Sequence, residues 1–378
     1  MSHDGALLRI VRDVEQFEAE YWGSAPLLVR ADADTGGFSD VWSIAAHDEF
    51  LANAVRAPLV RLIRTGEPIP VADYTSRVRL GGTDFKDVID PTKVAEHFAA
   101  GATVVAQSLH RTHPTVRRFV DDLAQEISHP VQANSYLTPP DATGLAPHAD
   151  LHDVFAVQIE GTKVWHVDGL GEVELRPGDA MYVPAGARPS ATSTDEPSLH
   201  LTIGILRVTY RAVLKRMLRT APTTLDDPLP LRYRSESTDL ASNIERMLDD
   251  VGGHLRSLSS EDWATSEASR RLTRPPSGGA LTAAASTWTI DATSTIERCP
   301  ASWSLTESEG LVRVEADGSA LTAPVSCRPA LEQLAPGRPV VVDDLDGLDA
   351  PSRSILARRL VGAGLCVLAH RHADVPAD

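Results

Sequence analysis

Residues 134–165 of the chain read NSYLTPPDATGLAPHADLHDVFAVQIEGTKVW. This stretch places His148 and Asp150 two residues apart, and Lys163 follows near its end. On a β-strand, residues two apart point to the same face, so we expect the imidazole and the carboxylate to project together. One imidazole and one carboxylate on a common face match two of the three protein ligands that non-haem Fe(II) oxygenases use. The His-x-Asp spacing alone occurs often by chance, so whether it marks a metal site depends on the surrounding residues.

Lys163 is the next informative residue. The chain has only four lysines against 32 arginines, and this one stands among apolar residues in a predicted strand. A buried ammonium group costs several kcal/mol unless an anion pairs with it. The distal carboxylate of 2-oxoglutarate would supply that anion. The alternative is a strand lysine whose side chain reaches solvent.

The pattern outside this stretch indicates several structural parts. Residues 131–206 form short β segments separated by turns, which is typical of a sandwich or barrel. Apolar residues recur at helical spacing in 7–30 and again in 208–274. The run PPSGG at 275–279 is typical of a linker, and 285–378 mixes short helical and strand patterns.

With those residues in view, the sequence resembles the ribosomal-oxygenase branch of the JmjC-type cupins. The similarity continues through RPGDAMYVPAG (176–186) and SLHLTIG (198–204), and upstream into ATVVAQSLHRTHPTVRRF (102–119). The resemblance implies that His148 and Asp150 bind Fe(II) and that Lys163 binds 2-oxoglutarate as co-substrate. It also implies that Asn134, Tyr136 and Thr202 line the same pocket.

The resemblance further implies a mainly β fold with appended helices. The expected order is a double-stranded β-helix (jelly-roll or cupin) domain over 1–207, a helical dimerisation region over 208–276 and a winged-helix-like domain over 285–378. The barrel itself is expected at 131–206. The apolar spacing in Leu240–Leu258 favours a homodimer formed through the helical region.

One position departs from the family pattern. The family's second histidine ligand ends a Pro-x-Gly-x-x-His motif, but here the motif ends at Pro189. Pairing 183–189 with 199–206 as a hairpin would set Pro189 opposite His200, which could then replace the missing ligand. A register error of one or two residues would remove His200 from that place. A packed His200 is the open alternative, and His152, in phase with His148 and Asp150, is a weaker candidate.

Composition limits the classes of partner. The formal charge is −16, and residues 285–378 carry 13 acidic residues against eight arginines. Such a balance disfavours nucleic acid and anionic membrane surfaces. No apolar run reaches the roughly 20 residues of a membrane span, and the first residues do not resemble a secretory signal. Three widely spaced cysteines are expected to be reduced, so a cytoplasmic location is expected.

The leading hypothesis is an Fe(II)- and 2-oxoglutarate-dependent oxygenase that hydroxylates a side chain of a peptide or protein. In it the metal is held by His148, Asp150 and His200. The second hypothesis is a degenerate JmjC-type cupin that has lost iron chemistry and acts as a dimeric binding or scaffold protein. Retention of His148, Asp150 and Lys163 together favours the first hypothesis, and Pro189 favours the second.

Overall fold

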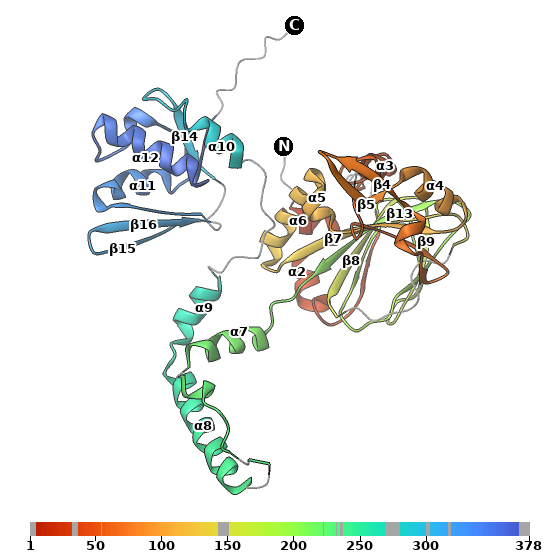
Figure 1. The fold of residues 1–378 in the computed structure, drawn as a ribbon, viewed down its shortest axis with the longest axis horizontal. Helices are drawn as coiled ribbons and strands as arrows, with labels where there is room; N and C mark the ends of the chain where they lie inside the picture. The colour runs from red at the N-terminus through yellow and green to blue at the C-terminus, as the bar shows by residue number, and fades with distance from the viewer. Residues whose placement is uncertain are drawn as a thin grey trace. The chain divides into compact units, whose positions relative to one another are not determined.

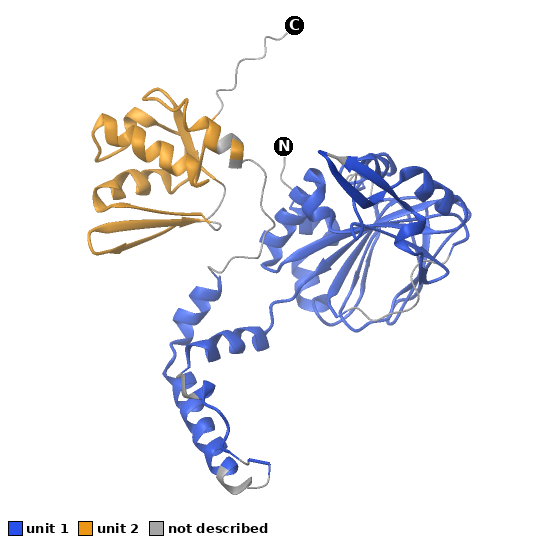
Figure 2. Cartoon of the chain, viewed as in Figure 1, with its two compact units in different colours: residues 1–273 blue, residues 274–378 orange. Residues whose placement is uncertain are grey.

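The computed structural model describes residues 5–31, 37–53, 55–142, 151–221, 223–231, 233–234, 237–268, 280–299, 303–316 and 319–369. The chain divides into two compact units, residues 1–273 and 274–378 (Figure 2). Each unit is described by itself below. The predicted three-part division, with its dimerisation region and winged-helix-like domain, stays a prediction.

The first unit is built on an eight-stranded sheet, in the order β1-β11-β8-β13-β7-β6-β2-β3. Every pairing in it is antiparallel, so it lacks the parallel arrangement of an α/β fold. Its strands are β1 (Leu27–Val29), β2 (Val60–Arg64), β3 (Glu67–Pro68), β6 (Thr103–Ala106), β7 (Val131–Thr138), β8 (Asp153–Glu160), β11 (Ala180–Val183) and β13 (Ser198–Ile205).

A second, three-stranded sheet faces the central strands of the first. It contains β9 (Lys163–Val167), β10 (Gly171–Leu175) and β12 (Ser190–Ser193), with β9 in the middle. Between the sheets, Trp165 and Val167 of β9 pack against Ala156 of β8 and Met181 of β11. The prediction of a mainly β fold with appended helices is confirmed. Across the described residues, the two sheets are hydrogen-bonded separately and do not join into one closed barrel.

The opposite face of the large sheet is covered by helices (Figure 1). Helix α6 shows why they form: Pro114 occupies its first turn, and Val116, Val120 and Leu123 repeat at helical spacing on its buried face. The helices and short helical turns of this part are α1 (Ala6–Val11), α2 (Val14–Gln16), η1 (Phe17–Tyr21), α3 (Ile44–Ala52), η2 (Val71–Asp73), α4 (Pro91–Ala99), α5 (Leu109–Thr112) and α6 (Pro114–Ile127). A hairpin of β4 (Thr75–Leu80) and β5 (Thr83–Ile89) adds a separate two-stranded sheet.

After β13 the chain becomes helical. The elements are α7 (Tyr210–Met217), η3 (Leu218–Thr220), η4 (Thr223–Asp226), α8 (Ser237–Ser257) and α9 (Ser260–Ala268). Arg216 of α7 donates to Glu267 of α9 from Nε at 2.7 Å. Large apolar side chains remain exposed along this helical segment, namely Tyr210, Leu214, Leu229, Leu231, Tyr233, Ile244, Met247 and Leu248.

The second unit has its own apolar core, in which Leu331 and Leu360 are fully buried. It contains α10 (Ala280–Ser286), β14 (Thr295–Arg298), β15 (Ser304–Ser308), β16 (Leu311–Ala316), β17 (Ser319–Pro324), η5 (Val325–Cys327), α11 (Arg328–Leu334), β18 (Val340–Val341), η6 (Val342–Asp344), α12 (Ala350–Gly362) and β19 (Cys366–Leu368). Two three-stranded sheets result, β18-β14-β19 and β15-β16-β17. None of the helices in the described part of the chain is long and apolar enough to cross a membrane.

Candidate functional site

The candidate site lies between the two facing sheets, on the inner face of β7 and β13. His200 pairs with Tyr136, and Thr202 pairs with Asn134. Directly opposed residues share a face, so these four predicted site residues lie together. The ring of Trp165 on β9 stands edge-on to the ring of His200, with centroids 5.2 Å apart. That contact shows that this face is directed toward the smaller sheet.

Lys163 begins β9 and is buried, with 2% of its surface exposed. Its Nζ donates a hydrogen bond to Thr138 Oγ1 at 2.8 Å. Among the described residues, no carboxylate forms an ion pair with this ammonium group. Burial alone lowers the pKa of Lys163 to about 7, because the charged form loses its hydration without gaining an anion.

His200 is packed between two aromatic side chains. Its ring stacks on Tyr136 at 5.0 Å with an interplanar angle of 6°, in addition to the edge contact with Trp165. Burial, and secondarily the nearby charge of Lys163, holds the pKa of His200 well below its usual value. The imidazole is therefore neutral at physiological pH, and its buried Nδ1 has no hydrogen-bond partner in the described part of the chain.

Two further buried polar atoms in the same interior lack partners within the described ranges. They are Oε1 of Gln158 and Nε1 of Trp165. Gln158 lies opposite His200 on β8, and its Nε2 donates to Ser198 Oγ at 2.9 Å. Buried polar atoms are almost always hydrogen-bonded, so the orphaned N–H of Trp165, together with the ammonium group of Lys163, suits an anionic ligand. Gln158 Oε1 is an acceptor and would need a donor group instead.

The predicted metal pair cannot be placed. His148 and Asp150 lie outside the described residues. His152 is described: it directly precedes β8, and its ring lies against Gly204 of β13. In the described part of the chain, no three His, Cys, Asp or Glu side chains come together as a metal site.

The predicted hairpin between 183–189 and 199–206 is wrong. β12 pairs with β9, and its first residue, Ser190, lies opposite His166. β13 pairs instead with β7 and β8 in the other sheet. Pro189 directly precedes β12 of the smaller sheet, whereas His200 lies on β13 of the large sheet, so the register argument for His200 as a metal ligand no longer holds. Its contacts place His200 near Lys163, in the pocket expected for the co-substrate.

The sequence did not single out Thr138, Gln158 or Trp165. Two of them lie two residues from a predicted site residue on the same strand: Thr138 from Tyr136 on β7, and Trp165 from Lys163 on β9. That alternation is the signal that could have found Thr138 and Trp165. Asn134 is also fixed in place, because its Oδ1 accepts a hydrogen bond from the backbone N–H of Ser108 at 2.9 Å.

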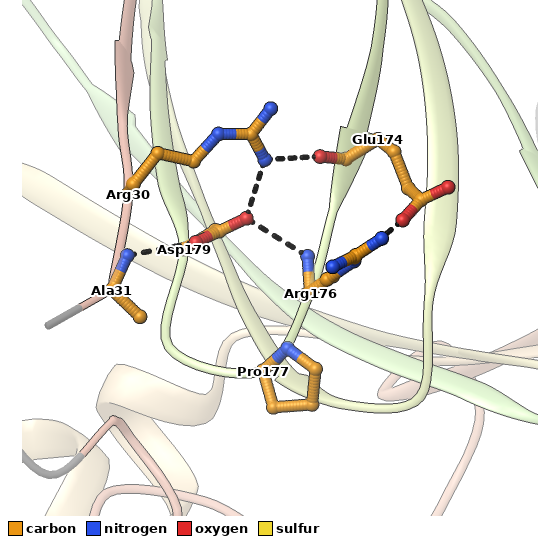
Figure 3. A pocket seen from close by; sticks show the side chains of 6 residues that line it. All are labelled: Arg30, Ala31, Glu174, Arg176, Pro177 and Asp179. Carbon is orange, nitrogen blue, oxygen red and sulfur yellow. Dashed lines mark hydrogen bonds and ion pairs between the residues drawn. The ribbon is translucent and has the colours of Figure 1, made fainter. Parts of the chain in front are cut away.

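A surface hollow at the turn before β11 has a different role. Asp179 accepts from Arg30 Nη1 at 2.7 Å and from the backbone N–H groups of Ala31 and Arg176 (Figure 3). Arg176 in turn donates to Glu174. The charges here pair with one another, so the cluster fixes the turn to the segment after β1 and leaves no unpaired charge for a ligand.

Comparison with known proteins gives a consistent result. Residues 108–172 match the JmjC domain family. Ribosomal oxygenase 1 of Gallus gallus is 29% identical over 214 residues, which is 50% of this chain and 34% of that protein. The bifunctional lysine-specific demethylase and histidyl-hydroxylase NO66 of Dictyostelium discoideum is 27% identical over 58% of this chain and 46% of that protein. The chain thus spans less than half the length of these relatives.

Solved structures extend the likeness along the chain. The crystal structure of the Escherichia coli ribosomal oxygenase YcfD aligns with a TM-score of 0.53 at 17% identity, covering 94% of this chain and 98% of that one. A YcfD structure in complex with cobalt and 2-oxoglutarate aligns at 0.50, with 18% identity and the same coverage. At such identities the likeness concerns the fold.

Proposed function

The chain is a cupin of the JmjC type, and on that premise we propose that it is an Fe(II)- and 2-oxoglutarate-dependent oxygenase that hydroxylates a side chain of a peptide or protein. Iron with 2-oxoglutarate supplies the oxidising power: one oxygen atom of O₂ enters a substrate C–H bond, and the other enters succinate as CO₂ leaves. The protein supplies binding, orientation and a site from which water is excluded.

The observation that carries this proposal is the buried ammonium group of Lys163, which forms no ion pair with any residue that the structure describes. A side chain that costs several kcal/mol to bury is retained in a core where methionine would pack at no such cost. A dicarboxylate bound here would pair with Lys163, and Thr138 would hold the ammonium group in position. Asn134, Tyr136 and Thr202 would line the remainder of the pocket.

His200 belongs to the same pocket. Its ring is held by Tyr136 and Trp165, and its pKa is depressed, so it presents a neutral imidazole beside Lys163. A neutral ring adds no second positive charge next to Lys163, and its orphaned Nδ1 can hydrogen-bond to a carboxylate. We therefore assign His200 to co-substrate binding.

His148 and Asp150 would hold the metal. This assignment rests on the motif in the sequence and on the JmjC match over 108–172. The usual third ligand is absent because Pro189 has no donor atom. A protein substrate is supported by the names of the relatives, a ribosomal oxygenase and a histidyl-hydroxylase.

A second candidate function is a dimeric binding or scaffold protein without iron chemistry. Pro189 is the observation that favours it. The two functions differ in whether the interior still binds a co-substrate, and that property can be measured without knowing the substrate.

The deciding experiment is an anaerobic titration of the full chain with Fe(II) and then 2-oxoglutarate. An oxygenase site gives the visible charge-transfer absorption of an iron–2-oxo-acid chelate, together with saturable binding of both. Lys163→Met serves as the matched variant, which should bind iron but require far more 2-oxoglutarate. A folded wild type that binds neither iron nor 2-oxoglutarate would establish the scaffold function instead.

A further inference from the structure

We propose that the connection between β13 and α7, residues 206–209, is held to the sheets by an acid-sensitive latch. The latch consists of two interactions, the hydrogen bond between Val208 and His129 and the ion pair between Arg207 and Asp153. A proton on His129 weakens both and frees the start of the helical segment. The inference goes beyond the proposed function, because it concerns the attachment of that segment and neither the metal nor the co-substrate.

The connection is tied to the residues that precede β7. The backbone N–H of Leu206 donates to the carbonyl oxygen of Pro130 at 2.8 Å. Two residues later, the backbone N–H of Val208 donates to Nδ1 of His129 at 3.0 Å. Thr209 follows as the N-cap of α7. The bond to His129 therefore fixes the chain immediately before the helix begins.

A buried carboxylate holds the neighbouring residue of the connection. Asp153, at the start of β8, is fully buried, and its Oδ2 lies 3.4 Å from Nε of Arg207. The other oxygen, Oδ1, accepts a hydrogen bond from the backbone N–H of Ala185 at 2.8 Å. A buried carboxylate that loses its cation is strongly destabilising, so the pair anchors Arg207 to the end of the large sheet.

His129 lies among aromatic and charged groups from three other parts of the fold. Its ring stacks on Trp22, with centroids 5.4 Å apart, and Trp22 stacks in turn on Tyr182 of β11. Burial lowers the pKa of His129, the charge of Asp153 opposes that shift, and the charge of Arg207 adds to it. Burial raises the pKa of Tyr182, so the phenol beside Trp22 is uncharged.

Protonation of His129 acts on both interactions of the latch. Only a neutral ring can accept the hydrogen bond from Val208, because Nδ1 must present a lone pair. A proton on Nδ1 would place a second donor against the N–H of Val208. The imidazolium would also attract Asp153 and compete with Arg207 for it. The hydrogen bond and the ion pair are therefore weakened by the same event.

The direction of the pH dependence follows from the lowered pKa. The folded protein binds a proton at His129 less tightly than the unfolded chain does, because folding buries the ring. The stabilisation from the latch is complete above the ordinary histidine value of 6.5 and is lost as the pH falls through the lowered value.

The test is hydrogen–deuterium exchange of the full chain in a pH series from about 7.5 to 4.5, corrected for the intrinsic pH dependence of exchange. We expect exchange in peptides covering 206–209 to rise by about tenfold or more at the acid end, because the Val208 bond opens. Peptides of β13 are the internal reference and should stay protected. Loss of protection in β13 in step with 206–209 would show general unfolding and overturn the inference.

His129→Asn separates the proton from the hydrogen bond. The amide oxygen of Asn takes the place of Nδ1 and can accept from Val208, but it does not titrate, so protection at 206–209 should be independent of pH. His129→Ala should show fast exchange already at the neutral end. His97→Asn, at a half-buried histidine of α4, is the matched control and should keep the wild-type response.

Arg207→Gln tests the coupling between the two interactions. It removes one cation that lowers the pKa of His129 and leaves Asp153 to favour the imidazolium, so the midpoint of the response should move to higher pH. A wild type with constant protection at 206–209, or a response that persists in His129→Asn, would overturn the latch. The proposed function would stand, because the titration with Fe(II) and 2-oxoglutarate measures it separately.

Discussion

Lys163 is the residue on which the proposed function most directly depends. Lys163→Met keeps most of the side-chain volume and removes the ammonium group. We expect 2-oxoglutarate to bind more weakly by about tenfold or more, about 1.4 kcal/mol, because charge-assisted bonds in a dry pocket exceed ordinary ones. Calorimetry on the metal-loaded protein measures the change. Lys86→Met, on the exposed side of β5, is the control and should leave the affinity unchanged.

The lowered pKa of Lys163 gives 2-oxoglutarate binding a predictable pH dependence. Near pH 6 the ammonium group is already charged, and above pH 7 binding must take up a proton, since the bound anion raises the pKa again. Affinity should therefore fall by up to about tenfold per pH unit above 7. His200 contributes nothing in this range, because its lowered pKa keeps it neutral.

Calorimetry in buffers of different ionisation enthalpy would count the proton taken up at pH 8. The Lys163→Met protein should show no uptake. An affinity that is flat from pH 6.5 to 8.5 in the wild type would contradict the assignment of Lys163 to the co-substrate.

Pro189→His would restore the ordinary ligand position of the family. Pro189 directly precedes β12, which lines the interior opposite the large sheet. We expect Pro189→His to raise the affinity for Co(II) above that of the wild type, since a second histidine would complete the two-histidine, one-carboxylate set with His148 and Asp150. Pro189→Ala removes the proline ring without adding a donor and should leave the affinity unchanged; calorimetry measures both.

At the scale of single residues, the sequence predicted the buried Lys163 but not the side chains that surround it. Lys163 stood out because a lysine in an arginine-rich chain occupied an apolar strand, and it is buried as expected. Thr138 and the two ring contacts of His200 join strands that are far apart in sequence. The alternation of side chains along one strand does not specify which residues of another strand they contact.

Among the elements, the positions of the strands in the sequence were more predictable than which strands pair with each other. Short strands and turns over 131–206 predicted a sandwich or barrel, and the resemblance to the JmjC-type cupins specified a jelly roll. The failed hairpin has a physical reason: β11 and β13 belong to the large sheet, while β12 between them pairs with β9 in the other. In a jelly roll, neighbours in sequence cross between sheets, so counting outward from a turn gives the wrong partner.

Gly161 lies in the turn between β8 and β9, and its backbone packs closely against a second turn. It has φ +62°, and a Cβ there would overlap the backbone carbonyl oxygen of Pro197, in the connection between β12 and β13. We expect Gly161→Ala to destabilise the protein by more than Gly81→Ala, whose φ is +55° but whose Cβ would meet nothing. Left-handed backbone costs about 1–2 kcal/mol in both, so the difference isolates the overlap. Urea denaturation measures it, and equal losses would contradict the contact.

The whole molecule is predicted to be a homodimer formed through residues 208–274. Ile244, Met247 and Leu248 lie three and four residues apart on α8 and remain exposed, which a second copy of the chain would cover. Light scattering at micromolar concentration should give about twice 40.6 kDa. Replacing Ile244 and Leu248 together with Asp should give a monomer, whereas Arg256→Asp near the end of α8 should not. A monomeric wild type would contradict the prediction.

The burial of Lys163 has one more consequence, which concerns the lifetime of the protein. A ligand that binds only the folded state stabilises it by RT ln(1 + [L]/Kd), about 2.7 kcal/mol at a hundredfold excess over Kd. Because the cation that would hold 2-oxoglutarate lies within the core, the metabolite would complete the packing of the fold as well as feed the reaction. When 2-oxoglutarate is scarce, the chain would unfold more often and be exposed to proteases.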